Sequence, residues 1–372
     1  MVKAHKRKLQ KQPFADKGPV APPAKEMANF ELMYQVGHGG FGKVFLARNH
    51  TNQQLVAIKA IDKPQIQKPE DEKKMQQLKD EVNVHRTLHF PFICQMHQCF
   101  ENGSKVYLVM EFCQSGNLHD VIENDFKGKW NEMPDEEEIK FYVSEINNIL
   151  YRDLKAENIM VDKFGHLKLT DFGQCKPNFT KSMTTRSSCG TEGCRAPEIG
   201  GDYGRPVDIW ALGALVYYMV TNNYLTLIRK NGPAKLPVVI KHATTKRAIS
   251  RDLQNFIKAL LTFKPEARPD ISAVMNLRFL ARDSEDWVRV VQKAQIPPVV
   301  PEFDDDVDWF SIFGYWGEPV DEPEPAVDYN VLFAGFEFNG DGNDAEVVVQ
   351  ELEVTQENEH AVKKEKKDDA DK

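Results

Sequence analysis

The sequence lacks several features that mark other classes of protein. No stretch of its 372 residues reaches the roughly 18 uncharged apolar residues that a membrane-spanning helix needs. The opening residues, Met1 to Ala4, have no apolar core, so we expect no signal peptide. The six cysteines include no Cys-x-x-Cys pair and no regular spacing. We therefore expect reduced thiols and a cytoplasmic or nuclear protein without a membrane span.

An excess of positive charge is also absent. The formal net charge is -8, so we expect no nucleic acid among the partners. The charge is uneven, because Lys6-Arg7-Lys8 make the N-terminus basic while the region after Pro301 is rich in Asp and Glu. Both ends are interpreted as solvated tails, and the alternative for the basic cluster is nuclear localisation or membrane-surface binding.

The order of the sequence patterns predicts a β-rich start followed by a helix-rich body. Residues 1–28 are rich in proline and show no periodic pattern, which indicates a disordered basic arm. The helix after Pro134 should begin with a capping box, because Glu138 follows Asp135 by three residues. This order suits a two-lobed α+β enzyme with a cleft between its lobes. We expect strands at 30–36, 43–48, 55–61, 106–111, 159–161 and 167–170, and helices at 70–88, 118–123, 135–149, 208–220 and 252–263.

The first motif with chemical meaning is a glycine-rich turn. Glycines in such a turn let the backbone approach phosphates closely, and backbone N–H groups then bond the phosphate oxygens. A dinucleotide-binding fold would continue with a helix, whereas a strand pattern, including Val44, follows here. The turn is therefore a candidate nucleotide-binding loop, made of Gly37, His38, Gly39, Gly40, Phe41 and Gly42.

A lysine on an apolar strand forms the second motif. Lys59 follows Val56-Ala57-Ile58, where it is placed to hold the α- and β-phosphates of a nucleotide. Such a lysine needs a carboxylate to orient it, and Glu81 on the next helix is the candidate. A solvated helix face is the alternative interpretation of Glu81.

Two further motifs supply catalytic and metal-binding groups. In the run from Tyr151 to Asn158, Asp153 is placed to accept the proton of a substrate hydroxyl and Lys155 to neutralise the transferring phosphoryl group. Asn158 and Asp171 are the candidate Mg²⁺ ligands, because a single short hairpin separates them. Downstream, Ala196-Pro197-Glu198 and Arg268 suggest a buried ion pair.

With these motifs in fixed order, residues 28–340 resemble the eukaryotic protein kinase superfamily. The resemblance is to its AGC group, which includes the cAMP-dependent kinase and protein kinase C. It implies a two-lobed kinase fold, ATP and Mg²⁺ as cofactors, and transfer of a phosphoryl group to Ser or Thr of proteins. It also implies a kinase domain at 29–280, an AGC-type tail at 281–340 and a disordered charged tail at 341–372. The AGC features are Tyr151-Arg152-Asp153, Phe90-Pro91-Phe92-Ile93, Thr170-Asp171-Phe172-Gly173 and Cys189-Gly190-Thr191.

The resemblance assigns roles in the adenine pocket and the activation segment. Met110 would lie at the back of the pocket, and the backbones of Glu111 and Cys113 would bond adenine. Arg152 would pair with a phosphate on Ser187, which implies an upstream kinase or a regulatory protein as partner. Three side chains would sandwich the adenine ring: Val44, Ala57 and Met160.

The run from Phe333 to Phe338 is similar to the AGC hydrophobic motif. Its aromatic residues are Phe333, Phe336 and Phe338, and Glu337 stands at the phosphosite position. We expect the motif to dock beside the helix of Glu81, with an exposed aromatic cluster in a disordered tail as the alternative.

Several residues depart from the family pattern. Asn117 replaces an acid that basophilic relatives carry, which leaves Glu157 of that acidic set and predicts a weaker preference for Arg. Glu192-Gly193-Cys194-Arg195 replaces the usual substrate-docking loop, and His85 stands where the family has an apolar residue.

The largest departure is a shortened helix before the catalytic loop. The chain is about nine residues shorter there than the family pattern, equivalent to about 13 Å of helix. We expect such a loss to expose apolar surface and strain the loop around Asp153. The alternative function is therefore a catalytically impaired kinase-fold scaffold, a pseudokinase-like binding protein.

Overall fold

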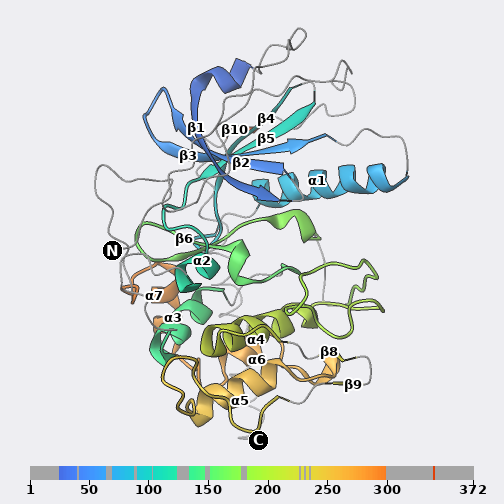
Figure 1. Ribbon diagram of the computed structural model, residues 1–372, viewed down its shortest axis with the longest axis vertical. Coiled ribbons are helices and arrows are strands. Elements are labelled where there is room, and N and C mark those ends of the chain that lie inside the picture. Colours follow the sequence, from blue (N-terminus) through green and yellow to red (C-terminus); the bar gives the residue numbers. More distant parts are fainter. Residues whose placement is uncertain are drawn as a thin grey trace, which may run out of the picture.

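The fold divides into a β-rich upper part and a helical lower part, joined by the segment after β5 (Figure 1). It is known from a computed structural model. The structure describes residues 25–39, 42–63, 69–87, 90–102, 104–123, 134–146, 151–176, 182–225, 228–229, 232–233, 236–298 and 338–339.

The upper part is built on one six-stranded sheet in the order β1-β2-β3-β5-β4-β10. All neighbouring strands pair antiparallel. Two small two-stranded sheets, β6-β7 and β8-β9, belong to the lower part. The strands are β1 (Phe30–Gly39), β2 (Gly42–Asn49), β3 (Leu55–Asp62), β4 (Met96–Glu101), β5 (Lys105–Glu111), β6 (Ile159–Val161), β7 (Leu167–Leu169), β8 (Ile228–Arg229), β9 (Gly232–Pro233) and β10 (Phe338–Asn339).

The helices lie mostly in the lower part, with α1 as the main exception. They are α1 (Pro69–Thr87), α2 (Leu118–Glu123), α3 (Glu136–Ile146), α4 (Pro206–Thr221), α5 (Arg251–Leu260), α6 (Ile271–Met275) and α7 (Ser284–Val291). Four short 3₁₀ helices complete them: η1 (Lys25–Asn29), η2 (Ala156–Asn158), η3 (Phe172–Gln174) and η4 (Pro265–Ala267).

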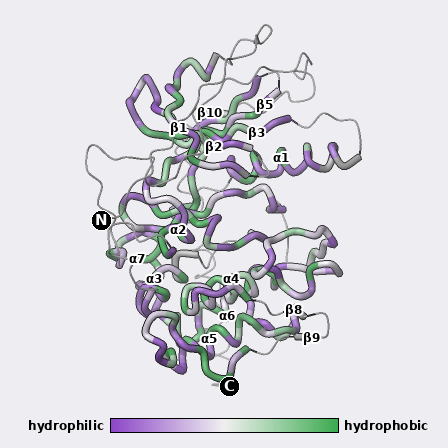
Figure 2. Tube along the Cα trace, in the orientation of Figure 1, coloured by the Kyte–Doolittle hydropathy of each residue, from purple (hydrophilic) through white to green (hydrophobic). Residues whose placement is uncertain are grey.

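Helix α1 packs against the sheet through one narrow face. It is mostly hydrophilic along its length (Figure 2). Its apolar residues Met75, Leu78 and Val82 are buried with Val106 and Leu108 of β5. Val84 and His85 of α1 are buried on the side of the lower part, where His85 contacts Phe172 of η3, so α1 bridges the two parts and thereby positions Glu81.

Helix α4 forms the centre of the lower part. It is buried on every side, from Val207 to Val220. Its Gly213 is required by a close helix crossing, because a Cβ there would lie 2.8 Å from the Leu260 Cβ and 2.9 Å from the Leu261 Cγ. The catalytic loop rests on this rigid centre through Asp208, as described below.

Most expected elements are confirmed, with differences at their ends. Hydrogen bonds between Asp135 and Glu138 form the predicted capping box of α3. The end of the helix expected at 135–149 lies outside the described residues beyond Ile146. The helix expected at 252–263 ends three residues early, at Leu260, because the chain turns there into η4. Strand β4 and helices α6 and α7 were not predicted, since their apolar patterns are short.

The tail reaches the edge of the upper sheet at β10. The backbone of Phe338 pairs with Cys99 of β4, antiparallel to it. This edge lies next to α1, which contacts β4. The other residues of the expected hydrophobic motif, Phe333, Phe336 and Glu337, lie outside the described residues.

Among the described residues, no helix is both long enough and apolar enough to cross a membrane.

Candidate active site

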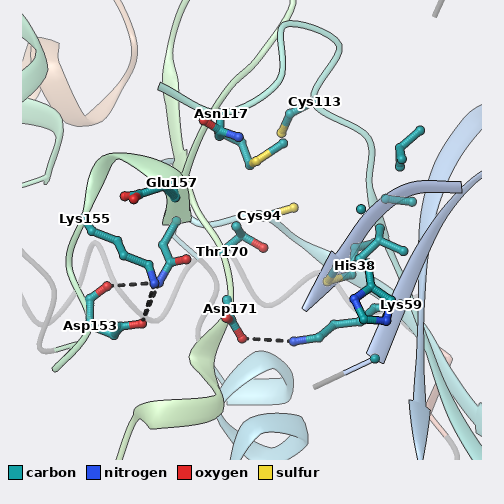
Figure 3. Close-up of a pocket in the computed structure, with 18 of the residues that line it drawn as sticks. His38, Lys59, Cys94, Cys113, Asn117, Asp153, Lys155, Glu157, Thr170 and Asp171 are labelled. Atoms are coloured by element: carbon teal, nitrogen blue, oxygen red, sulfur yellow. Dashed lines mark hydrogen bonds and ion pairs between the residues drawn. The ribbon is translucent and has the colours of Figure 1, made fainter. Parts of the chain in front are cut away.

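A lysine with two carboxylate partners lies at the junction of the two lobes. Lys59 of β3 is 8% exposed, and its Nζ lies 2.6 Å from Glu81 Oε1 of α1. The same nitrogen lies 3.0 Å from Asp171 Oδ1 of the lower lobe. Figure 3 shows Lys59 and Asp171 pointing toward each other across the cleft. Of the acids near Glu81 on α1, it is Glu81 that meets the lysine.

These contacts determine the charge of the lysine. Burial by itself would lower the pKa of Lys59, but the charges of Glu81 and Asp171 outweigh burial and raise it. Burial would raise the pKa of Asp171, but the Lys59 charge lowers it. Lys59 is therefore a cation and Asp171 an anion at neutral pH.

A second cluster surrounds Asp153. Its Oδ1 accepts a 3.0 Å hydrogen bond from Thr191 Oγ1, and its Oδ2 accepts one of 3.0 Å from Asn158 Nδ2. Lys155 Nζ lies 3.3 Å from the same Oδ2 and donates a 2.7 Å bond to Thr191 Oγ1. Each member of this cluster fixes the orientation of the others. The sequence had singled out three of them, and Thr191 was missed as a site residue because a lone hydroxyl carries no motif.

The catalytic loop is anchored from below by Asp208 of α4. Its carboxylate oxygens accept hydrogen bonds from the backbone N–H groups of Tyr151 and Arg152, with N···O distances of 2.7 and 2.5 Å. Burial raises the pKa of Asp208 to about 6, although these two hydrogen bonds oppose the rise. The Tyr151 hydroxyl donates to the backbone carbonyls of Thr170 and Asp171. The loop of Asp153 and the segment of Asp171 are thereby tied together.

The shortened helix still delivers the catalytic loop to the cleft. The described part of α3 reaches Ile146, and the described chain resumes at Tyr151. Within the described parts of α3 and the loop, no large apolar side chain is exposed, so the expected exposure is not observed there. Arg152 does adopt a left-handed backbone, with φ of 70°. Such a conformation costs a non-glycine residue about 1–3 kcal/mol and is common in functional loops.

A cleft of about 610 Å³ connects these two clusters. In Figure 3, Lys59 and His38 from the upper sheet lie on one side of the cleft and Asp153 and Lys155 of the catalytic loop on the other, with Cys113 and Asn117 after β5 above them. Gly40 and Phe41 of the glycine-rich turn lie outside the described residues. Sequence-predicted residues in the lining are Gly37, His38, Gly42, Val44, Ala57, Lys59, Met110, Glu111, Cys113, Asp153, Lys155, Asn158, Met160 and Asp171.

One position in the turn requires glycine. Gly42 has φ of 131°, and a Cβ there would lie 2.0 Å from the Ala60 carbonyl oxygen. No side chain fits at that distance, so the turn and β3 pack backbone against backbone.

Acidic groups line one part of the cleft. Asn117 donates a 2.7 Å hydrogen bond to Asp120 Oδ2. Both side chains line the cleft together with Glu157. Glu157 Oε1 accepts a 2.9 Å bond from the Tyr224 hydroxyl. Asp120 therefore supplies a carboxylate beside Asn117, which sequence reasoning missed because it considered only the family's usual acidic positions.

The activation segment brings Ser187 to the catalytic loop. Arg152 Nη1 donates a 3.1 Å hydrogen bond to Ser187 Oγ. The Tyr203 hydroxyl lies 3.1 Å from the same oxygen. Lys176 Nζ donates to the Thr185 hydroxyl, two residues away, at 2.7 Å. Arg152 therefore contacts this serine directly, and Lys176 is linked to it through the Thr185 hydroxyl, which lies 3.3 Å from Ser187 Oγ. Cations at such distances suit a phosphate.

Two buried contacts lie outside the lining of the cleft. The Arg268 side chain is fully buried and forms the expected ion pair with both carboxylate oxygens of Glu198, at 2.5 and 2.7 Å. His85 of α1 is 2% exposed and lies edge-on against Phe172, with ring centroids 4.8 Å apart. Neither ring nitrogen of His85 has a hydrogen-bond partner among the described residues.

Comparison with known proteins gives this site a family. Residues 30–280 match the protein kinase domain family. The chain belongs to the protein kinase family. Three similar kinases are ribosomal protein S6 kinase beta of Caenorhabditis elegans, RAC serine/threonine-protein kinase of Drosophila melanogaster and serine/threonine-protein kinase Sgk1 of Xenopus tropicalis. They are 33%, 29% and 32% identical to this kinase over 79%, 85% and 76% of its length. These relatives place it in the AGC group.

The kinase spans about half the length of the first two of these relatives, 56% and 54%, and 69% of the third.

Proposed function

We propose that this chain is an ATP-dependent protein kinase that phosphorylates Ser or Thr of other proteins. The observation that carries the proposal is a single cleft holding two clusters, one on Lys59 and one on Asp153. The names of the similar proteins support the choice of Ser and Thr.

Lys59 is suited to orient the nucleotide. Its pairing with Glu81 and Asp171 fixes the ammonium group in the cleft, where it can bind the α- and β-phosphates. The backbones of Glu111 and Cys113 offer hydrogen-bonding groups to adenine. Val44, Ala57 and Met160 supply apolar contacts to the ring, with Met110 behind it.

Asp171 and Asn158 fit a magnesium ion. Both residues line the cleft and carry side-chain oxygen atoms, which are the ligands that Mg²⁺ prefers. Asn158 uses its Nδ2 toward Asp153, which leaves its amide oxygen available to a metal. When bound, Mg²⁺ neutralises charge on the phosphates.

Asp153 is suited to accept the proton of the substrate hydroxyl. The hydroxyl oxygen forms a bond to the γ-phosphorus, the bond to the β–γ bridging oxygen breaks, and ADP leaves. Thr191 and Asn158 hold the Asp153 carboxylate in place, so little reorientation is needed. Lys155, next to Asp153, is placed to stabilise negative charge on the transferring group.

No observation on the described residues favours the scaffold alternative. Pseudokinases usually lose one of the required groups. Here Lys59 and Glu81 form their ion pair, and Asp153 lies with Lys155 in the cleft despite the shortened helix.

We also propose the regulatory and organisational features that the resemblance implies. Phosphorylation of Ser187 by an upstream kinase would add charge beside Arg152 and Lys176. The tail at 281–340 would hold α1 inward through its hydrophobic motif, and the pairing of β10 with β4 supports this. Six free, buried cysteines suit a reducing compartment, cytoplasmic or nuclear.

The direct test is phosphorylation of a peptide array with radiolabelled ATP and Mg²⁺. We expect transfer to Ser and Thr peptides that Asp153→Asn abolishes. A parallel calorimetric titration with ATP should show Mg²⁺-dependent binding, lost in the double variant Lys59→Ala with Asp171→Ala. Mg²⁺-ATP binding without transfer to any peptide would instead support the scaffold alternative.

A further inference from the structure

An arginine without a carboxylate partner lies beside the phosphoacceptor position. Arg195 is half-buried in the turn that follows Thr191. Its Nη2 donates a 2.5 Å hydrogen bond to the Gly190 carbonyl oxygen. Its Nε is buried and has no hydrogen-bond partner among the described residues. The guanidinium is thus fixed in place by a neutral group.

The position of Arg195 follows from its neighbours. A substrate hydroxyl must come within hydrogen-bonding reach of Asp153, and Thr191 is bonded to that carboxylate. Gly190 and Thr191 line the cleft, and Arg195 is bonded to Gly190. The guanidinium therefore lies next to Gly190, in the part of the lining that also holds Thr191 and Asp153.

Two other arginines of the chain illustrate the usual pairing with a carboxylate. Arg268 pairs with Glu198, and Arg186 of the same activation segment forms two hydrogen bonds to Asp202, of 2.7 and 2.8 Å. No carboxylate in the described part of the chain lies within 4.0 Å of the Arg195 guanidinium. The acid on its own turn, Glu192, is exposed and does not contact it.

We infer that Arg195 selects substrates with an anionic group, a carboxylate or a phosphate, within two residues of the phosphoacceptor. A guanidinium binds both groups through paired N–H donors. The hydrogen bond from Arg195 Nη2 to the Gly190 carbonyl already orients this guanidinium. The inference rests on the proposed kinase activity and adds a charge preference to it. Arg195 is a specificity-determining residue, because it would contact the substrate outside the reacting atoms.

The test compares peptides that differ only beside the acceptor Ser. Asp, phosphoserine, Ala and Lys are placed at each of the two positions on either side. Both kcat/KM and binding of fluorescein-labelled peptides by anisotropy are measured. We expect the Asp or phosphoserine peptide to exceed its Ala counterpart by about five- to tenfold at one position, mainly through KM, and less at high salt. The comparison of Asp with phosphoserine identifies which anion is preferred.

Variants separate charge from structure. Arg195→Gln keeps an N–H donor for Gly190 but removes the charge, so it should abolish the preference. Arg195→Lys should keep part of it, and Arg195→Glu should shift the preference toward Lys. The control is Arg186→Gln, which removes an equally charged residue of the same segment and should leave the ratio unchanged.

The inference is overturned if the parent binds Asp, phosphoserine and Ala peptides equally, or if Arg195→Gln retains the preference. Selective binding without phosphorylation of any peptide would refute the proposed activity and leave the inference standing.

Discussion

His85 offers the sharpest test of how the active arrangement is held together. Its imidazole lies between α1 and Phe172, 2% exposed, with neither nitrogen bonded in the described part of the structure. A buried polar group without a partner costs about 1–3 kcal/mol. His85→Leu removes that cost and gives up an edge-to-face ring contact worth about 0.5–1.5 kcal/mol. The polar cost is the larger, so the variant should be more stable by about 1 kcal/mol.

The pH dependence of this effect has a definite sign. Burial, and next the Lys59 charge, lower the pKa of His85 to about 3, from about 6.5 in the unfolded chain. Between these values the unfolded chain binds a proton that the folded chain does not. Stability therefore falls as the pH drops below about 6.5, by about 2 kcal/mol at pH 5. His85→Leu removes this contribution, so its advantage over the parent should grow by about that amount at pH 5.

Thermal unfolding by scanning fluorimetry at pH 7.5 and pH 5 measures both effects. For a domain of this size, about 1 kcal/mol corresponds to about 2–4 °C in Tm. His50→Leu is the matched control, because His50 is exposed and the same substitution there removes no buried polar group. A lower Tm for His85→Leu at pH 7.5, or an advantage over the parent that does not grow at pH 5, would refute the reasoning.

Three further predictions follow from particular contacts. Glu198→Gln should lower the free energy of unfolding by about 3 kcal/mol in denaturant titrations, because it leaves the buried Arg268 without its counter-charge. Peptide libraries should show weaker Arg dependence than in basophilic relatives, since Asn117 removes one partner worth about 1–3 kcal/mol. Asp120 beside Asn117 keeps a carboxylate in the cleft, so dependence on a single arginine should remain, and strong dependence on two arginines would contradict the prediction. Phe333→Ala with Phe336→Ala should lower both activity and Tm, and unchanged values would mean that the tail does not dock.

The catalytic groups could be predicted from sequence because their chemistry fixes their spacing. Lys59 and Asp171 are 112 positions apart, yet each sits in a short motif with its own local structure. A strand supplies Lys59 and a hairpin supplies Asp171. The fold then needs only to bring this strand and this hairpin together.

The charge environment around those groups could not be predicted in the same way. Asp120 was not identified as a site residue, because its carboxylate meets Asn117 only through the turn at the start of α2. Thr191 acts on Asp153 through a single hydroxyl, with no pattern to mark it. Such contacts depend on where side chains end in space, which periodicity does not report.

The shortened helix shows which element positions the catalytic loop. If α3 delivered the loop by its length, the missing residues would displace Asp153 from the cleft. Instead, Asp208 of α4 accepts the backbone N–H groups of Tyr151 and Arg152, and α4 is buried on every side. The loop is therefore positioned by its anchor on α4. A kinase fold can lose helix there and keep its site, provided that Asp208 remains.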